Sequence, residues 1–175
     1  MSLRLHYATA HDITQLSDIG RSSYRHHFAD RWQVESELAQ YLDEEFSPEA
    51  IQQGLRSAQV DWFLISTTEV IGLAKLSYQQ TVPNVQADQQ AQIGTQINKI
   101  YLLPEHTGQG HGDAIFRKIE QLALEHGDDY IWLEVLTSNP QARQFYESCG
   151  MQFIQQTLFH SATQQNPMDL FGKPL

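Results

Sequence analysis

The chain has 175 residues, the length of one typical domain, and folding should bury about 70% of the surface that the unfolded chain exposes. Hydrophobic residues (41%) and charged residues (18%) have ordinary globular frequencies, so collagen-like, coiled-coil, disordered and membrane-spanning classes all fit poorly. Because 21 acidic residues outnumber 11 lysines and arginines, the formal net charge of −10 disfavours nucleic acid and anionic membranes as partners and favours a cation.

The first third of the chain predicts one strand followed by three helices. Apolar and polar residues alternate over residues 3–7, which is typical of a strand. Apolar residues at helical spacing predict amphipathic helices over residues 11–28 and 34–42. The dipeptide Ser47-Pro48 offers a hydroxyl cap before a proline at the first helical position, so we expect a third helix that runs through Leu55.

The middle of the chain predicts a β-hairpin, a loop and a further strand. Residues 62–65 and 70–76 are apolar runs separated by a short polar turn, which is typical of a hairpin. Residues 79–96 are rich in glutamine and contain few large apolar side chains, so we predict a mobile loop there. A strand over residues 97–103 follows.

The last third predicts a helix, a strand, a helix and two more strands. The first helix begins after the glycines of residues 108–112 and ends at Gly127, and the strand covers residues 130–135. Asn139-Pro140 starts the second helix, and Gly150 fits its C-terminal cap. The two closing strands are expected near residues 151–158 and 167–171. Together the elements predict a mixed sheet with helices on both faces.

The negative charge is concentrated in residues 30–50. This stretch holds seven acidic residues and only Arg31 as a basic one, so it contributes six of the net negative charges. Two interpretations stay open, namely a solvated helix face and a wall that binds a cation.

Gly108-Gln109-Gly110-His111-Gly112-Asp113 lies between a predicted strand and a predicted helix. Glycines let the main chain approach an anion closely, and the first amides of a helix lack internal partners, so a diphosphate would fit here. The Walker pattern is absent, and Asp113 stands where the dinucleotide-binding pattern has its third glycine. A flexible turn with glycine caps is the alternative.

Two polar side chains stand out in the later helix, which Asn139-Pro140 starts. Asn139 occupies its entry and Tyr146 lies two turns deeper, and a purely structural interpretation makes them an N-cap and a core aromatic. The histidines His106 and His111 flank the glycine turn and could touch phosphates.

The cysteine and histidine content indicates neither disulfides nor metal. Cys149 is the only cysteine, so it cannot close an internal disulfide, and the eight histidines show no zinc-ligand spacing. We therefore expect a cytoplasmic protein without a metal site, in which Cys149 packs rather than reacts.

In combination these motifs resemble the GCN5-related N-acetyltransferase (GNAT) family. The strand Ile100–Pro104, the glycine turn of residues 107–112 and the pattern Asn139-x-x-Ala142-x-x-Phe145-Tyr146-x-x-x-Gly150 occur in the family's order and spacing. More narrowly, the chain is similar to bacterial spermine/spermidine N-acetyltransferases of the PaiA type through Tyr24-x-x-x-Phe28, Tyr41-Leu42, Phe46-Ser47-Pro48-Glu49, Ile131-Trp132-Leu133 and Met168-Asp169-Leu170.

This resemblance implies an α/β (α+β) fold, the GNAT fold, with one mixed, mostly antiparallel sheet of about six or seven strands. It implies a single acetyltransferase domain over residues 1–175. Within it, the acceptor-side helices would cover residues 11–57, the acetyl-CoA-binding core residues 95–150 and the C-terminal strands residues 151–173.

The resemblance also implies transfer of an acetyl group from acetyl-CoA to a primary amine by direct attack in a ternary complex. Amides of the strand would hold the acetyl and pantetheine part, and amides of the glycine turn would hold the pyrophosphate. Tyr146 would protonate the departing thiolate, because a phenol of pKa about 10 is protonated at neutral pH. The implied cofactor-binding residues are Ile100, Tyr101, Leu102, Thr107, Gly108, Gln109, Gly110, His111, Gly112, Asn139 and Tyr146.

A small polycationic amine such as spermidine or spermine is the expected substrate. Glu44 and Glu45 are the candidate clamps for its distant ammonium group. A peptide or protein amine is the alternative acceptor, and a non-catalytic acyl-CoA sensor is the alternative function. A homodimer would be common for such an enzyme.

Two positions depart from the family's pattern. Thr107 stands where the family usually has arginine or glutamine at the start of the pyrophosphate loop, so we expect a modest affinity for the cofactor. Asn98, with Gln96 two residues earlier, stands where many relatives carry a glutamate beside the acceptor. Neither amide is a base, so the sequence leaves the proton acceptor unassigned.

Overall fold

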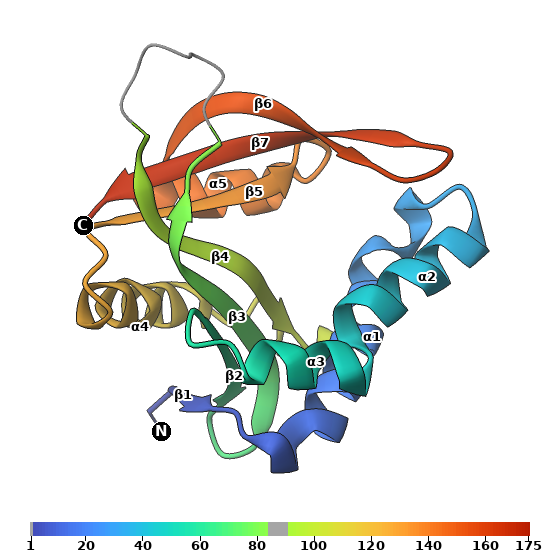
Figure 1. Cartoon of the computed structure of the whole chain (residues 1–175), viewed down its shortest axis with the longest axis horizontal. Helices are drawn as coiled ribbons and strands as arrows, with labels where there is room; N and C mark the ends of the chain where they lie inside the picture. Colours follow the sequence, from blue (N-terminus) through green and yellow to red (C-terminus); the bar gives the residue numbers. More distant parts are fainter. Residues whose placement is uncertain (1, 84–90) are drawn as a thin grey trace. The chain divides into compact units, whose positions relative to one another are not determined.

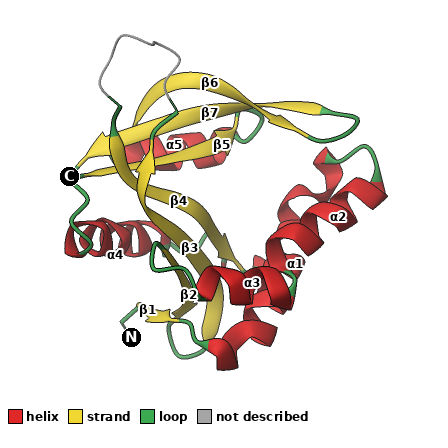
Figure 2. Cartoon of the chain, in the orientation of Figure 1, coloured by secondary structure: helices red, strands yellow, loops and turns green. Residues whose placement is uncertain are grey.

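The computed structural model describes residues 2–83 and 91–175, whose helices and strands are drawn in Figures 1 and 2. The α-helices are α1 Ile13–Phe28, α2 Glu35–Phe46, α3 Pro48–Leu55, α4 Gly112–Glu125 and α5 Pro140–Ser148. The strands are β1 Arg4–Tyr7, β2 Val60–Ser66, β3 Val70–Thr81, β4 Ile93–Leu102, β5 Tyr130–Leu136, β6 Gln152–His160 and β7 Gln165–Pro174. Short 3-10 turns cover Ala10–Asp12, Ala29–Arg31 and Pro104–His106.

The strands form one sheet in the order β1-β2-β3-β4-β5-β7-β6. β4 and β5 run parallel, whereas β1 with β2 and β5 with β7 run antiparallel. The expected α/β fold with a mixed, mostly antiparallel sheet of six or seven strands is therefore confirmed. No helix within the described part of the chain is long and apolar enough to cross a membrane.

The chain divides into two compact units, and strands β3 and β4 each contribute to both. Unit 1 consists of Met1–Lys75, Lys99–His111 and His160–Gln164. Unit 2 consists of Leu76–Asn98, Gly112–Phe159 and Gln165–Leu175. The predicted cofactor residues are thus shared between the units, with positions 100–111 in unit 1 and Gly112, Asn139 and Tyr146 in unit 2.

In unit 1, helices α1, α2 and α3 pack on one another, and α3 packs on β2. All three helices that the sequence predicted are confirmed. Ser47 Oγ accepts a hydrogen bond from Ala50 N at 3.2 Å, so the hydroxyl cap before Pro48 forms as expected. The buried core of this unit consists of Leu16, Ile19, Tyr24, Leu38, Leu42, Phe46, Ile51, Trp62, Leu64 and Leu73.

In unit 2, α4 packs on β5, and β7 runs along the whole of β5. The pairing extends from Tyr130 opposite Pro174 to Leu136 opposite Met168, so β7 is longer than the sequence indicated. The apolar face of α4 is confirmed, since it buries Ile115, Phe116, Ile119 and Ala123.

The predicted mobile loop over residues 79–96 is wrong at both ends. β3 continues to Thr81, and β4 begins as early as Ile93. Residues 84–90, the centre of the predicted loop, lie outside the described residues. Val82 N donates a hydrogen bond to the Gln92 carbonyl at 2.8 Å, so main-chain pairing extends past the strand ends.

The buried carboxylate of Asp128 explains why this polar segment stays in the sheet. Gln79, which adopts a left-handed φ of 55°, donates to it through its main-chain N–H at 3.1 Å and also through its side-chain amide. Thr95 Oγ1 donates to the same carboxylate at 2.7 Å. The polar composition indicated a loop, but a partner distant in sequence satisfies these groups inside the fold.

Candidate active site

The glycine turn in unit 1 has the main-chain conformation that an anion-binding loop needs. Gly108 and Gly110 adopt left-handed φ values of 70° and 79°, which glycine alone adopts without strain. An added Cβ would meet nothing within 4 Å at either position, so the turn is open on these sides. Within the described part of the chain, the N–H groups of residues 108–112 have no acceptor. Five unsatisfied donors in an open turn fit a diphosphate.

Two side chains of the turn bond back to the 3-10 turn that precedes it. Thr107 Oγ1 donates to the Pro104 carbonyl at 2.8 Å, and Gln109 Nε2 donates to the Glu105 carbonyl at 2.7 Å. The Thr107 hydroxyl proton is therefore already engaged, and the hydroxyl has no spare donor for a phosphate. These bonds fix the shape of the turn and leave its main-chain amides as the donors toward a ligand.

The end of β4 presents alternate residues in different environments. The Tyr101 ring packs against Tyr24, Phe28 and Phe46, with ring centroids 6.0–6.1 Å apart, so its side chain belongs to the aromatic core of unit 1. Side chains alternate along a strand, so Ile100 and Leu102 face the other way, and both are half-buried. The Tyr101 ring is therefore engaged in packing within unit 1.

The histidines of unit 1 are placed beside this region. His27 Nε2 lies 3.2 Å from the Leu102 carbonyl, so the end of α1 contacts the end of β4. His106 Nε2 lies 3.7 Å from Glu69 Oε1, an ion pair when the imidazole is protonated. His111 is half-buried at the last position of the turn.

In unit 2, the start of α4 packs against α5. A Cβ added at Gly112 would lie 2.6 Å from the Phe145 ring, so only glycine allows this approach. Phe116 contacts both Phe145 and Tyr146, with ring centroids 6.3 and 6.4 Å apart. The structure thereby brings the predicted residues Gly112 and Tyr146 into one cluster.

Asn139 combines the structural role with a free donor. Its Oδ1 accepts from Ala142 N at 3.3 Å, so it is the N-cap of α5, as the structural interpretation held. Its amide nitrogen has no acceptor among the residues that the structure describes. That N–H group remains available to a ligand, so capping and binding do not compete for the same atom.

The surroundings of Tyr146 keep its hydroxyl protonated. Burial raises the pKa of Tyr146 well above the ordinary phenol value, and the nearby Cys149 raises it further. The pKa of the Cys149 thiol is also raised, first by burial and then by the charge of Asp113. A phenol that stays neutral has a proton to give, whereas a thiol of raised pKa is a poor nucleophile, in agreement with the expected packing role of Cys149.

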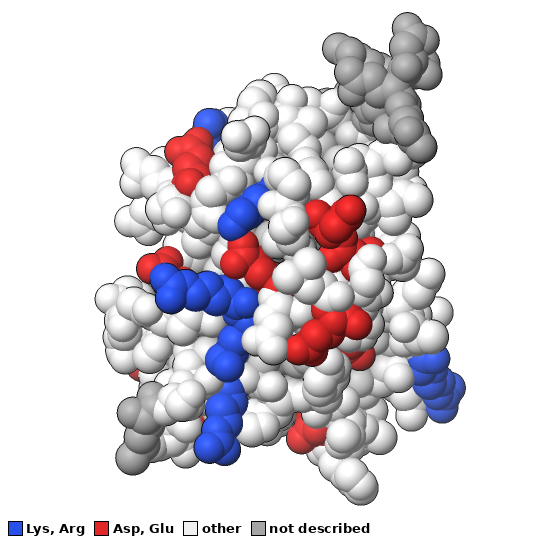
Figure 3. Space-filling model, turned by 90° about the vertical axis from the view of Figure 1, so that its left-hand side faces the viewer, with Lys and Arg blue, Asp and Glu red and all other residues white. Residues whose placement is uncertain are grey.

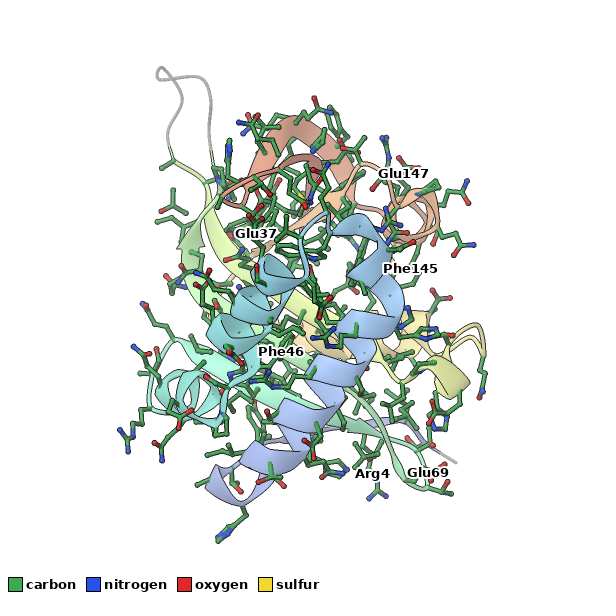
Figure 4. The ribbon with its side chains drawn as sticks, turned by 90° about the vertical axis from the view of Figure 1, so that its right-hand side faces the viewer. Arg4, Glu37, Phe46, Glu69, Phe145 and Glu147 are labelled. Carbon is green, nitrogen blue, oxygen red and sulfur yellow. The ribbon has the colours of Figure 1, made fainter. Side chains whose placement is uncertain are left out.

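Most acidic side chains of α2 already have partners within unit 1. Arg25 pairs with Glu35 and Arg21 with Asp43, both at 2.8 Å, and Ser161 donates to Glu37 at 2.6 Å. Figure 4 labels Glu37 in the first turn of this helix and Phe46 at its last residue. Figure 3 shows a different face of the molecule, on which both acidic and basic side chains are exposed. The interpretation as a solvated, ion-paired helix face therefore accounts for much of this stretch.

The side chains of the predicted clamps, Glu44 and Glu45, have different partners and do not form one binding site. Lys99 Nζ lies 2.5 Å from Glu45 Oε2, and the Lys99 side chain is only 4% exposed. Burial alone would raise the pKa of Glu45, but the charge and hydrogen bond of Lys99 and the charge of Lys75 outweigh it, so its pKa is lowered. Glu44 is exposed, and among the described residues it accepts a hydrogen bond only from Gln40 Nε2, at 2.8 Å.

Asn98 and Gln96, the amide residues on β4 where many relatives carry a glutamate, belong to unit 2. Asn98 Oδ1 accepts a hydrogen bond from Ser77 Oγ at 2.7 Å, which engages the only acceptor of its side chain. Gln96 lies opposite Trp132 in the parallel pairing of β4 with β5. Within the described residues no group of three or more histidine, cysteine, aspartate or glutamate side chains is arranged to hold a metal ion.

A cavity of about 500 Å³ lies elsewhere in unit 1, and none of the predicted site residues lines it. Arg4 and Ser66 lie opposite one another in the β1–β2 register and so face it together. Glu69, which also lies near His106, contributes to its rim. Arg4 and Glu69 are labelled in Figure 4.

Most of the chain matches the sequence pattern of one protein family. Residues 21–151 match the acetyltransferase (GNAT) family, and this range includes the glycine turn, Asn139 and Tyr146. The chain belongs to the GNAT family. This confirms the family that the motifs indicated.

The relatives of this GNAT chain match it over part of its length. The thialysine N-epsilon-acetyltransferase of Bos taurus is 38% identical over 56 residues, which cover 32% of this chain and 33% of the relative. An uncharacterised N-acetyltransferase of Lactobacillus delbrueckii subsp. lactis, in the pepI 3' region, is 30% identical over 98 residues, or 56% of this chain and 54% of the relative. The chain thus spans about a third to a half of the curated relatives it matches.

Solved structures share the whole GNAT fold at low sequence identity. The PaiA N-acetyltransferase of Thermoplasma acidophilum, solved with coenzyme A, has a TM-score of 0.71 at 18% identity, and the alignment covers 100% of both chains. The spermidine N-acetyltransferase of Vibrio cholerae, solved with CoA and spermine, has a TM-score of 0.66 at 16% identity, with 99% of this chain and 95% of that chain covered. The expected likeness to PaiA-type proteins is confirmed at the level of the fold.

Several residues that matter to the site were missed by the sequence analysis. Lys99 neutralises Glu45, Asp128 holds β3 to β4, and Asp169 bonds the start of α5. Each is a charged residue at a buried position within or beside an apolar segment, and each is at most 5% exposed. A charged residue within an apolar segment indicates that its side chain is buried beside a polar or charged partner. The sequence does not identify that partner.

Proposed function

We propose that this protein is an acetyl-CoA-dependent N-acetyltransferase that acetylates a primary amine. The observation that carries the proposal is the glycine turn with its five unsatisfied main-chain donors, in a chain of the GNAT family. The turn runs directly into α4, and anion binding at such a junction needs no further charged side chain.

Each predicted cofactor residue except Thr107, whose hydroxyl donates to the Pro104 carbonyl, has a role in this proposal. The N–H groups of residues 108–112 hold the pyrophosphate, and the main chain of residues 100–102 holds the pantetheine and acetyl part. The amide of Asn139 donates to the pantetheine arm, and Tyr146 donates its proton to the departing thiolate. The raised pKa of Tyr146 supports this last role, because the phenol carries its proton throughout the neutral range.

The acceptor we propose is a polyamine such as spermidine or spermine. The net charge of −10 supports a polycation, and a spermidine N-acetyltransferase shares the fold. Because Glu45 is paired with Lys99, Glu44 is the member of the predicted clamp that is available to a distant ammonium. An exposed carboxylate there attracts the substrate without stabilising the charge on the reacting nitrogen.

The attacking amine must lose a proton before it reacts. An alkylamine of pKa about 10.4 is neutral at pH 7 in about one molecule in 2,500, a cost of about 4.6 kcal/mol. Neither Asn98 nor Gln96 accepts this proton, so we propose that water carries it to solvent.

Release of free thiol from acetyl-CoA tests the proposal. The purified protein is incubated with acetyl-CoA and, separately, with spermidine, spermine, a lysine-rich peptide and an aminoglycoside. We expect release with the polyamines. Thiol release with the peptide alone would show that the acceptor is a protein amine rather than a polyamine. Binding of acetyl-CoA without release on any amine would replace the enzyme by an acyl-CoA sensor.

A further inference from the structure

Strand β7 contacts helix α5 at both of its ends. Asp169 and Lys173 stand four residues apart on β7, so their side chains leave the same face of the strand. Asp169 bonds Thr137, just before α5, and Arg143, the fourth residue of α5, and Lys173 bonds Cys149 at the end of the helix. All these residues belong to unit 2, and Phe145 and Glu147 mark α5 in Figure 4.

At the start of the helix, the Asp169 carboxylate binds two donors. Arg143 Nη1 donates to one oxygen at 2.8 Å, and Thr137 Oγ1 donates to the other at 2.9 Å. Thr137 N also donates to the Pro167 carbonyl at 3.0 Å, so the main chain of β7 holds the same entry point. The Asp169 side chain is 3% exposed, and such buried charge-assisted bonds restrict the position of both partners.

At the end of the helix, Lys173 Nζ donates to the Cys149 carbonyl at 3.0 Å. The same ammonium pairs with Glu120 of α4 and lies 5.7 Å from the centre of the Phe116 ring. Its alkyl chain also lies against Gly150, where an added Cβ would come within 3.5 Å of the Lys173 Cε. The C-terminal carbonyl of α5 thus has a cationic partner on β7.

The distance between Asp169 and Lys173 along β7 matches the length of α5. Four residues of antiparallel strand rise about 13.6 Å, and a nine-residue helix such as α5 is about 13.5 Å long. Asp169 bonds Thr137, two residues before the N-cap Asn139, and Lys173 bonds the Cys149 carbonyl at the C-terminal end, where a cation is favourable for the helix dipole.

We propose that Asp169 and Lys173 are positioning residues that fix α5, and with it Asn139 and Tyr146, for acetyl transfer. This inference rests on the proposed function for its kinetic consequence. The structural part, the clamping of α5 by β7, is independent of it. Two charges at matched spacing set both the axial position and the rotation of the helix, whereas one bond would leave it free to pivot.

The experiment uses Asp169→Asn and Lys173→Met, each with a matched control from the same unit. Asp128→Asn removes an equally buried carboxylate that bonds β3 and β4 rather than α5. Lys118→Met removes a half-buried lysine of α4 that, among the described residues, makes no hydrogen bond or ion pair with α5. Hydrogen exchange of the α5 amides is measured for each variant at the same number of degrees below its melting temperature. The kcat and the KM for the amine are measured as well.

We expect the α5 amides to exchange at least about tenfold faster in Asp169→Asn and Lys173→Met, and at the wild-type rate in both controls. We expect kcat to fall by about 10- to 100-fold in Asp169→Asn with the KM for the amine unchanged, because a small misplacement of a catalytic group is costly. In a Tyr146→Phe background the same substitution should have little further effect on kcat.

Two results would overturn the inference. One is wild-type exchange of α5 in both test variants, and the other is equal acceleration of α5 in Asp128→Asn. If the wild type releases no thiol with any amine while α5 still loosens in the test variants, the proposed function fails and the clamp stands. If Asp169→Asn does not fold, Lys173→Met and Thr137→Val carry the same comparison.

Discussion

Lys99 Nζ lies 2.5 Å from Glu45 Oε2, so an ion pair joins β4 to the last turn of α2. The ammonium also lies 5.0 Å from the centre of the Phe46 ring. The Lys99 side chain is 4% exposed and that of Glu45 34%, so the lysine is buried only because the carboxylate accompanies it. Glu45, which was predicted to bind an ammonium group of the substrate, therefore already pairs with the ammonium group of Lys99.

Lys99→Met should destabilise the fold, because it leaves Glu45 half-buried without its partner. We expect a loss of about 1–3 kcal/mol in the free energy of unfolding, less than for a fully buried pair because water still reaches the carboxylate. Urea denaturation measures the loss. The double variant Lys99→Met/Glu45→Leu is the control and should recover most of it, since Glu45 no longer leaves an unpaired carboxylate. A double variant as unstable as the single one would contradict this account.

The same pair predicts a dependence of stability on acid pH. The pKa of Glu45 is lowered below its ordinary value of 4.5, so the folded state favours the carboxylate. The resulting stabilisation is fully present above the ordinary pKa and is lost as the pH falls through the lowered one. The difference in melting temperature between wild type and Lys99→Met should thus be constant from pH 6 to pH 7.5 and shrink below about pH 4. A difference that stays constant into that range would show that the pair does not contribute through its charge.

Tyr146→Phe should lower kcat by about 100-fold or more while changing the affinity for acetyl-CoA little, because only the proton donor is removed. Since burial raises the pKa of Tyr146, the phenol stays protonated above pH 10, and it should cause no alkaline fall in kcat below that pH. Steady-state kinetics and calorimetric titration with CoA separate the two effects. Tyr130→Phe is the matched control, since Tyr130 lies on β5 outside the proposed site. An unchanged kcat in Tyr146→Phe would exclude the acid role.

Gly110→Ala should weaken binding of acetyl-CoA, because it strains the φ of 79° and shifts the donors of the turn. The strain should cost about 1–2 kcal/mol of stability. Gly127→Ala is the control, since Gly127 has a φ of 82° and equally open surroundings but follows the end of α4. Both variants should lose similar stability, and only Gly110→Ala should raise the KM for acetyl-CoA. Equal KM values in the two variants would remove the turn from the cofactor site.

Glu44→Gln should raise the KM for spermidine by about two- to fivefold at low salt, as expected for an exposed charge pair. The effect should vanish near 1 M salt, where the screening length falls to about 3 Å. Initial rates at varied spermidine and salt measure it. Glu49→Gln, an exposed acid in the first turn of α3, should leave the KM unchanged. If the two variants behave alike, the attraction comes from net charge rather than from Glu44.

The sequence by itself determined the features that depend on neighbours along the chain. The cap of Ser47 on Ala50 and the cap of Asn139 on Ala142 each span three residues, so local spacing was enough to predict them. The left-handed glycines of the turn and its position before α4 follow in the same way from local conformational preference. The family could be named from the sequence because its motifs are local.

Only the tertiary structure decided which charges are free. Lys99 and Glu45 are 54 residues apart, Gln79 and Asp128 are 49 apart, and no local preference encodes either pairing. Glu44 and Glu45 are adjacent in sequence, but successive residues point about 100° apart around a helix, so one reaches Lys99 and the other faces solvent. Whether a carboxylate binds a ligand or holds the fold depends on what packing places beside it, because the free energy of a charge is set by its surroundings in space.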